Sequence, residues 1–165
     1  MNVVATEIPD VKIVEPQVFG DSRGWFVEQY NAGRYKAAGI DADFVQDNES
    51  FSSKGVVRGA GWDVAVDIRK GSPTFGRHVA VTLSAENRRQ LYIPRGFAHG
   101  FIVLEDETLF SYKCDRLYCK EADRGLLFSD PALGIEWPGL GIEIKLSEKD
   151  IRNPLLRDIE PWEEK

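Results

Sequence analysis

Short runs of β-branched and aromatic residues, separated by Gly, Pro, Asn or Asp, recur along most of the chain. Such runs are typical of strands joined by tight turns, and they predict an all-β fold, either an antiparallel sandwich or a barrel. The clearest candidates for strands are residues 11–19, 24–30, 62–69, 77–84, 89–94, 99–105 and 108–114.

The run WDVAVDIR, residues 62–69, alternates most regularly. Trp62, Val64, Val66 and Ile68 fall on one face of a strand with a period of two, which predicts a strand with one buried face. The other face would carry Asp63, Ala65, Asp67 and Arg69.

Helical patterns are scarce. Residues 32–40, AGRYKAAGI, predict one or two helical turns before Gly39, and residues 146–154, LSEKDIRNP, predict a short helix capped by Ser147. No repeat, low-complexity tract or linker divides the sequence, so residues 1–165 are expected to form a single domain.

Composition narrows the function classes. The chain has 21 Lys and Arg against 27 Asp and Glu, and a net charge of -6 does not favour binding to nucleic acid or anionic lipid. No apolar run approaches the roughly 20 residues that span a bilayer, and the acidic N-terminus does not resemble a signal peptide. We therefore expect a cytoplasmic protein whose two cysteines, Cys114 and Cys119, are reduced thiols.

Several kinds of site are disfavoured by the sequence. The chain contains two histidines, His78 and His99, and neither has the spacing of a metal-ligand motif, so we expect no bound metal. No glycine-rich phosphate loop or G-x-S-x-G elbow is present. A phosphate group would therefore have to be held by arginine side chains and backbone amides.

Five phrases are richer in polar and aromatic residues than strand ends require: GDSRGWFVEQYN, FVQDNES, VVRG, IPRGFAHGF and LSEKD. Because of these phrases, the chain resembles the dTDP-4-dehydrorhamnose 3,5-epimerases, in which matching phrases occur in the same order from Met1 to about Pro161. The resemblance implies a cupin-type jelly roll (a double-stranded β-helix) with short peripheral helices, a homodimer, and no metal or other cofactor.

The resemblance also implies a reaction. Family members invert carbons 3 and 5 of a dTDP-linked 4-keto-6-deoxy sugar through enolates, in the biosynthesis of dTDP-L-rhamnose. Such a site needs a base for the proton next to the ketone, a group that stabilises the enolate oxygen, and an acid on the opposite face.

The family's site residues can be transferred to matching positions. His99 matches a histidine that contacts substrate, Tyr118 matches the acid, and Asp150 matches the carboxylate that orients the catalytic histidine. By residue type alone, His99 would be a structural histidine and Asp150 a residue on a solvated helix face. Substrate-binding positions are implied for Phe19, Arg23, Phe26, Glu28, Gln46, Asp47, Asn48, Arg58 and Lys149.

The sequence departs from the family after Arg58. Family members continue there with L-H-[YF]-Q, a loop and a strand that carries a lysine, whereas this chain continues with Gly59, Ala60, Gly61 and Trp62. We therefore predict that an internal deletion has removed the catalytic His and Lys, together with one hairpin of the jelly roll. Residues 59–61 would form a short turn or bulge that closes the gap.

Three hypotheses remain open from the sequence. The chain could be a working or weakly working epimerase in which another group, His99 or Tyr118, acts as the base. It could instead bind dTDP-sugars without turnover, or it could be a variant with a structural or assembly role alone. A related sugar ketoisomerase would also need a base.

Overall fold

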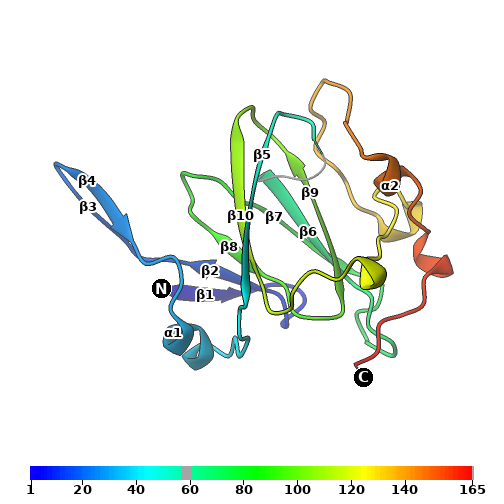
Figure 1. Cartoon of the computed structure of the whole chain (residues 1–165), viewed down its shortest axis with the longest axis horizontal. Helices are drawn as coiled ribbons and strands as arrows, with labels where there is room; N and C mark the ends of the chain where they lie inside the picture. Colours follow the sequence, from blue (N-terminus) through cyan, green and yellow to red (C-terminus); the bar gives the residue numbers. More distant parts are fainter. Residues whose placement is uncertain (57–60, 165) are drawn as a thin grey trace.

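The computed structural model describes residues 1–56 and 61–164. The described residues form four small antiparallel sheets with short helices at the periphery (Figure 1). The strands are β1 (Asn2–Ala5), β2 (Lys12–Glu15), β3 (Val18–Asp21), β4 (Gly24–Val27), β5 (Gln46–Ser52), β6 (Gly61–Asp67), β7 (His78–Thr82), β8 (Gln90–Tyr92), β9 (Phe97–Val103) and β10 (Thr108–Cys114). The helices are α1 (Ala32–Ala37) and α2 (Glu148–Ile151), with 3-10 turns η1 (Lys120–Ala122), η2 (Pro131–Leu133) and η3 (Leu156–Asp158).

Strand order places β6 at the centre of one sheet, between β7 and β9. A second sheet has the order β1-β2-β8, and β5 pairs with β10 in a third. The fourth sheet is the hairpin β3–β4, which projects away from the other sheets (Figure 1). The predicted all-β fold is confirmed.

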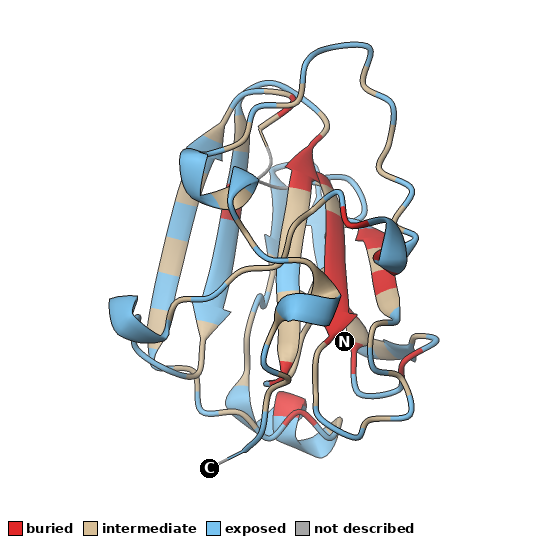
Figure 2. Cartoon of the chain, turned by 90° about the vertical axis from the view of Figure 1, so that its right-hand side faces the viewer, coloured by how far each residue is buried: buried red, intermediate tan, exposed pale blue. Residues whose placement is uncertain are grey.

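The central strand β6 is buried along most of its length (Figure 2). Val64 and Val66 pack against Leu133 and a set of partly buried side chains that includes Trp62 and Trp137. The polypeptide after β10 supplies much of this layer, and full burial of one such valine contributes about 1.5–3 kcal/mol. Trp62 thus lies on the Val64 face, as its spacing predicts.

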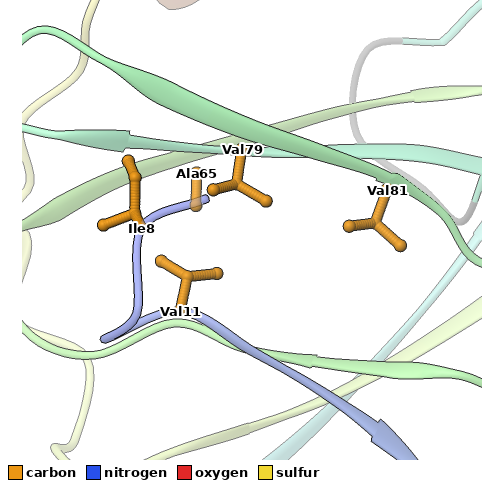
Figure 3. Close-up of a cluster of buried hydrophobic side chains, with 5 residues drawn as sticks. All are labelled: Ile8, Val11, Ala65, Val79 and Val81. Carbon is orange, nitrogen blue, oxygen red and sulfur yellow. The ribbon is translucent and has the colours of Figure 1, made fainter. Parts of the chain in front are cut away.

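The opposite face of β6 is buried as well. Ala65 is 0% exposed and packs with Ile8, Val11, Val79 and Val81, which come from the N-terminal loop and β7 (Figure 3). Asp63 and Asp67 on the same face are 2% and 0% exposed. The prediction of a single buried face was wrong, because strands and loops cover β6 on both sides.

Two strands were absent from the sequence prediction. β1 is short, and β5 has the polar sequence QDNESFS, which lacks the apolar alternation that identifies the other strands. The run at residues 11–19 divides into β2 and β3 around Pro16, whose ring removes a backbone donor.

Both predicted helices are confirmed. Asn31 Oδ1 accepts the backbone N–H of Arg34 at the start of α1, and the Ser147 hydroxyl accepts that of Asp150 in α2. These side chains satisfy amides that have no partner within the helix. Neither of these helices, nor any 3-10 turn in the described ranges, is long and apolar enough to cross a membrane.

Candidate active site

His99 and Asp63 form a hydrogen-bonded pair between neighbouring strands. In the antiparallel pairing of β6 with β9, Ala65 lies opposite His99, so Asp63 shares a sheet face with the imidazole. His99 Nε2 lies 2.9 Å and 3.1 Å from the two carboxylate oxygens of Asp63. Because an ionised carboxylate only accepts hydrogen bonds, Nε2 carries the hydrogen and Nδ1 keeps the free lone pair.

Aromatic rings adjoin this pair. The His99 ring is 5.2 Å from Phe101 and 6.4 Å from Phe110, measured between centroids, and Tyr112 follows 5.7 Å beyond Phe110. The side chain of His99 itself remains 32% exposed. The imidazole therefore combines a buried carboxylate partner, an apolar wall and access from outside.

A row of polar side chains lies on one face of β5. Gln46, Asn48 and Ser50 alternate with exposed residues, so the three share the less exposed face. Gln46 Nε2 donates to Asn48 Oδ1 at 2.9 Å, and Asn48 Nδ2 contacts Cys114 Sγ at 3.6 Å. The Ser50 hydroxyl is buried and has no hydrogen-bond partner among the described residues, which is uncommon in native proteins.

The strand pairing connects this row to the aromatic wall. Asn48 lies opposite Tyr112, and Ser50 lies opposite Phe110, in the antiparallel register of β5 with β10. Burial raises the pKa of the Cys114 thiol, which therefore stays protonated and inert. The row that contains the predicted substrate-binding residues Gln46 and Asn48 thus adjoins the aromatic wall of His99 through Ser50.

Tyr118 is attached to the same row from the segment after β10. Its backbone N–H donates to Gln46 Oε1 at 3.1 Å, and its hydroxyl donates to Asp123 Oδ2 at 3.2 Å. The Lys149 ammonium donates to the same oxygen of Asp123. The hydrogen bond to Asp123 raises the pKa of Tyr118.

Asp150 lies near this cluster in sequence but has another partner. Its carboxylate accepts the Ser147 hydroxyl at 2.6 Å and completes the cap of α2. Within residues 1–56 and 61–164, no hydrogen bond or ion pair joins Asp150 to His99. The predicted role of Asp150 in orienting a catalytic histidine stays a prediction.

The predicted residues of the projecting hairpin lie apart from the histidine. Phe19 and Phe26 are direct neighbours across β3 and β4 and are 52% and 66% exposed. Arg23 forms an ion pair with Asp21 at the tip, and Glu28, after β4, pairs with Arg34 of α1. In this chain, therefore, these four residues do not meet the cluster around His99.

Two further predictions concern the region before β6. Asp47 lies on the exposed face of β5 and pairs with Lys113 at 2.6 Å, away from the face that carries Gln46. Arg58, Gly59 and Ala60 lie outside the described residues. Of the turn predicted for residues 59–61, the structure therefore describes only Gly61, which is the first residue of β6.

Sequence reasoning missed Asp63, Ser50 and Asp123. Asp63 was placed on a solvent-facing side, although an acidic residue within a strongly apolar strand could have indicated a buried partner. Ser50 belongs to a strand without apolar alternation. Asp123 lies in an irregular segment, where no periodicity relates it to Tyr118 or Lys149.

The described residues hold no group of three or more His, Cys, Asp or Glu side chains that could bind a metal ion. The donors near His99 are instead amides, hydroxyls and one paired carboxylate. This set can hold a polar organic ligand and move a proton.

Comparisons with known proteins place the fold among nucleotide-sugar epimerases of the cupin type. The structure matches a Legionella pneumophila dTDP-6-deoxy-D-glucose-3,5-epimerase in complex with dTDP-4-keto-L-rhamnose, with a TM-score of 0.91 and 47% identity over 96% of this chain and 94% of that chain. It also matches a dTDP-4-dehydrorhamnose 3,5-epimerase from Bacillus anthracis with TDP and PPi bound, with a TM-score of 0.87 and 41% identity over 93% and 98% of the two chains.

The family model for dTDP-4-dehydrorhamnose 3,5-epimerase matches residues 5–158. A curated relative from Shigella flexneri with that name is 50% identical over 178 aligned residues, covering 96% of this chain and 92% of the relative. The chain belongs to the dTDP-4-dehydrorhamnose 3,5-epimerase family. The comparisons do not show that the segment with the catalytic histidine is deleted, so that part stays a prediction.

Proposed function

We propose that this protein is a dTDP-4-dehydrorhamnose 3,5-epimerase, which converts dTDP-4-keto-6-deoxy-D-glucose at carbons 3 and 5 during dTDP-L-rhamnose biosynthesis. The observation that carries the proposal is the near full-length similarity to the Legionella epimerase that binds dTDP-4-keto-L-rhamnose. The hydrogen-bonded row on β5 beside His99 supports it, because amide and hydroxyl groups suit a sugar nucleotide.

The retained residues can supply a base and an acid. Nδ1 of His99 would remove a hydrogen next to the ketone, and the Asp63 carboxylate would stabilise the resulting imidazolium across the Nε2 hydrogen bond. The electron pair of the broken C–H bond moves into the enolate. Tyr118, whose hydroxyl is directed by Asp123, would then return a proton to carbon from the other face.

We also propose that catalysis is weaker than in the relatives. The family's base belongs to a phrase that is absent after Arg58, and removing a positioned base typically costs about 10²- to 10⁴-fold in rate. The alignment with the Shigella relative includes 178 residues, more than the 165 of this chain, so some aligned positions have no residue here.

A homodimer would reconcile the two separated groups of predicted site residues. The hairpin β3–β4 projects with Phe19 and Phe26 uncovered, and Arg23 at its tip is also exposed. If the hairpin of one subunit reaches the cluster around His99 of the other, the rings can stack on thymine or sugar and the arginine can approach the diphosphate. We propose this arrangement for a single-domain, cytoplasmic enzyme that uses no cofactor.

The decisive experiment is solvent deuterium exchange, monitored by NMR, with dTDP-4-keto-6-deoxy-D-glucose in D₂O. Exchange at carbon 3 or 5 that is lost in His99→Asn and retained in the control His78→Asn would support the proposal. His78 is a matched control because it lies on β7 and, among the residues that the structure describes, forms no hydrogen bond with Asp63 or with a predicted site residue. No exchange at high protein concentration would exclude catalysis.

A non-catalytic role as a dTDP-sugar binder is the second candidate. It is favoured by the combination of retained polar residues on β5 with the missing histidine phrase. Calorimetry with dTDP distinguishes the possibilities: binding without exchange supports the second candidate, whereas neither binding nor exchange leaves a structural or assembly role.

A further inference from the structure

Asp123 is the point at which two predicted site residues meet. One carboxylate oxygen, Oδ2, accepts both the Tyr118 hydroxyl and the Lys149 ammonium, although the two donors are 31 residues apart in the sequence. Asp123 follows the η1 turn directly, and its side chain is 32% exposed compared with 54% for Lys149. The acid and the cation therefore depend on one shared acceptor.

The segment that carries Asp123 is fixed against the segment that carries Lys149. A Cβ atom placed on Gly125 would lie 2.3 Å from the Asn153 side chain, so the two segments pack closely here. Leu127 N–H donates to Pro154 O at 2.8 Å nearby. The Arg124 guanidinium further holds the turn by donating to Glu121 O at 2.7 Å. These contacts determine where the Asp123 carboxylate lies.

The charges in the cluster act in opposite directions. The bond to Asp123 raises the pKa of Tyr118, while the Lys149 ammonium by itself lowers it. The same carboxylate raises the pKa of Lys149, and the pKa of Asp123 is lowered, first by the Lys149 hydrogen bond. Glu121, Arg124 and Asp150 are the other charged groups that act on these three.

We propose that Asp123 is a positioning residue for the epimerase reaction: it fixes the direction of the Tyr118 hydroxyl, whose backbone is joined to Gln46 of the substrate-binding row, and keeps the Lys149 ammonium next to it. The proposal rests on the proposed function for its catalytic meaning. Without Asp123, the hydroxyl loses its acceptor and the ammonium is free to move away. Asp123 acts through Tyr118 and Lys149 and needs no contact with the substrate.

The test is a direct titration of the Tyr118 phenol, which requires no turnover. Protein labelled with ¹³C at the tyrosine ζ carbon is titrated by NMR, and Tyr118→Phe assigns the signal among the five tyrosines. In Asp123→Asn we expect a lower pKa for Tyr118, because the negative acceptor is gone. Asp123→Glu should retain a raised pKa, and Lys149→Gln should raise it further.

Glu148→Gln is the matched control, since it also converts a carboxylate near Lys149 to an amide, and Glu148 pairs with Arg152 instead. Its Tyr118 titration should equal that of the parent. An unchanged Tyr118 pKa in a folded Asp123→Asn protein overturns the proposal. If that variant does not fold, an unchanged pKa in Lys149→Gln overturns it as well.

Deuterium exchange then separates the two proposals. If the parent exchanges, Asp123→Asn should slow exchange and Asp123→Glu should restore much of it. If the parent does not exchange but Tyr118 titrates as expected, the proposed function fails and the positioning of Tyr118 by Asp123 stands.

Discussion

Asp63 is the residue that gives His99 a defined chemical state. A buried carboxylate that accepts Nε2–H fixes one tautomer of the imidazole and leaves the lone pair on Nδ1. A lone strand histidine would have no fixed tautomer. The pair is therefore the strongest candidate for a base among the described residues.

Asp63→Asn tests this role. The asparagine amide can donate to Nε2, which moves the imidazole hydrogen to Nδ1 and removes the free lone pair. We expect deuterium exchange to fall by about 10²-fold or more. Asp41→Asn, at an exposed ion pair with Lys36, should leave exchange unchanged. Equal rates in Asp63→Asn and the parent would contradict a base at His99.

Asp67 has a structural role on the same strand. Burial alone raises its pKa, but donors from Arg69, Ser72 and Thr74 outweigh burial and bring the pKa well below its usual range. The hydroxyls of Ser72 and Thr74 lie 2.6 Å and 2.5 Å from Asp67 Oδ2. The carboxylate therefore joins the end of β6 to the loop that follows.

The depressed pKa of Asp67 predicts a dependence of stability on pH. Its contribution is complete above the unfolded pKa of about 4 and is lost as the pH falls through the lower folded value. Asp67→Asn should destabilise the protein by about 1–3 kcal/mol at pH 7. The difference should shrink below about pH 4. Urea unfolding at several pH values measures it, and a difference that is constant with pH would contradict this prediction.

At the scale of elements, the start of β6 depends on close backbone packing. Gly61 has a φ of +156°, and a Cβ placed there would lie 2.4 Å from Ile102 O and 2.8 Å from Leu104 N. These are backbone atoms of β9 and of the residue after it, which cannot move without disturbing the sheet. The glycine is therefore needed where the chain enters its central strand.

Gly61→Ala should lower the free energy of unfolding by about 1–3 kcal/mol, because the methyl group overpacks the β6–β9 contact. Gly100→Ala is the matched control, since Gly100 lies on β9 opposite Val64 and a Cβ there meets no atom within 4 Å. Urea unfolding measures the free energy of unfolding of both variants. Equal values would contradict the prediction, because they would show that the start of β6 accommodates the added methyl group.

At the scale of the whole molecule, the position of the hairpin β3–β4 suggests shared sites between subunits. Phe19, Trp25 and Phe26 are 52%, 59% and 66% exposed, although the Arg88 guanidinium lies over the Trp25 ring. They belong to a hairpin that projects away from the other sheets (Figure 1). A monomer rarely keeps such a patch without a function. In a twofold dimer, each hairpin could serve the site of the other subunit.

Mixed subunits test this arrangement. The variants His99→Asn and Arg23→Ala should each catalyse deuterium exchange weakly. An equimolar mixture that is unfolded and refolded together should recover about one quarter of the parental active sites. Half of the dimers would be heterodimers, and one of the two sites in each heterodimer would be intact. Recovery no greater than the sum of the two separate variants would indicate that each subunit completes its own site.

A chimera addresses the predicted deletion. Inserting the corresponding histidine-containing segment of the Shigella flexneri relative after Gly59 should raise the exchange rate by about 10²- to 10⁴-fold, if the rest of the site is sound. A chimera of the same length with Ala in place of the inserted histidine is its control. A folded chimera with no gain would contradict the proposed cause of weak catalysis.

The sequence by itself determined the all-β class, most strands, the two capped helices and the family, because alternation, turn residues and ordered motifs are local properties of the chain. It did not predict β5, whose polar residues are held by pairing with β10. It also placed Asp63 on a solvent-facing side. Burial depends on which elements cover a strand, and residue spacing does not contain that information.

The tertiary structure alone decided which side chains meet. Asp63 reaches His99 across two paired strands, Asp123 joins Tyr118 to Lys149, and the hairpin with Arg23 lies apart from both clusters. The first two contacts join residues that are distant in the sequence. The position of the hairpin separates residues that the family resemblance assigns to one site. The chemistry of a proton-transfer site depends on distances of about 3 Å between such groups, and only the folded chain sets those distances.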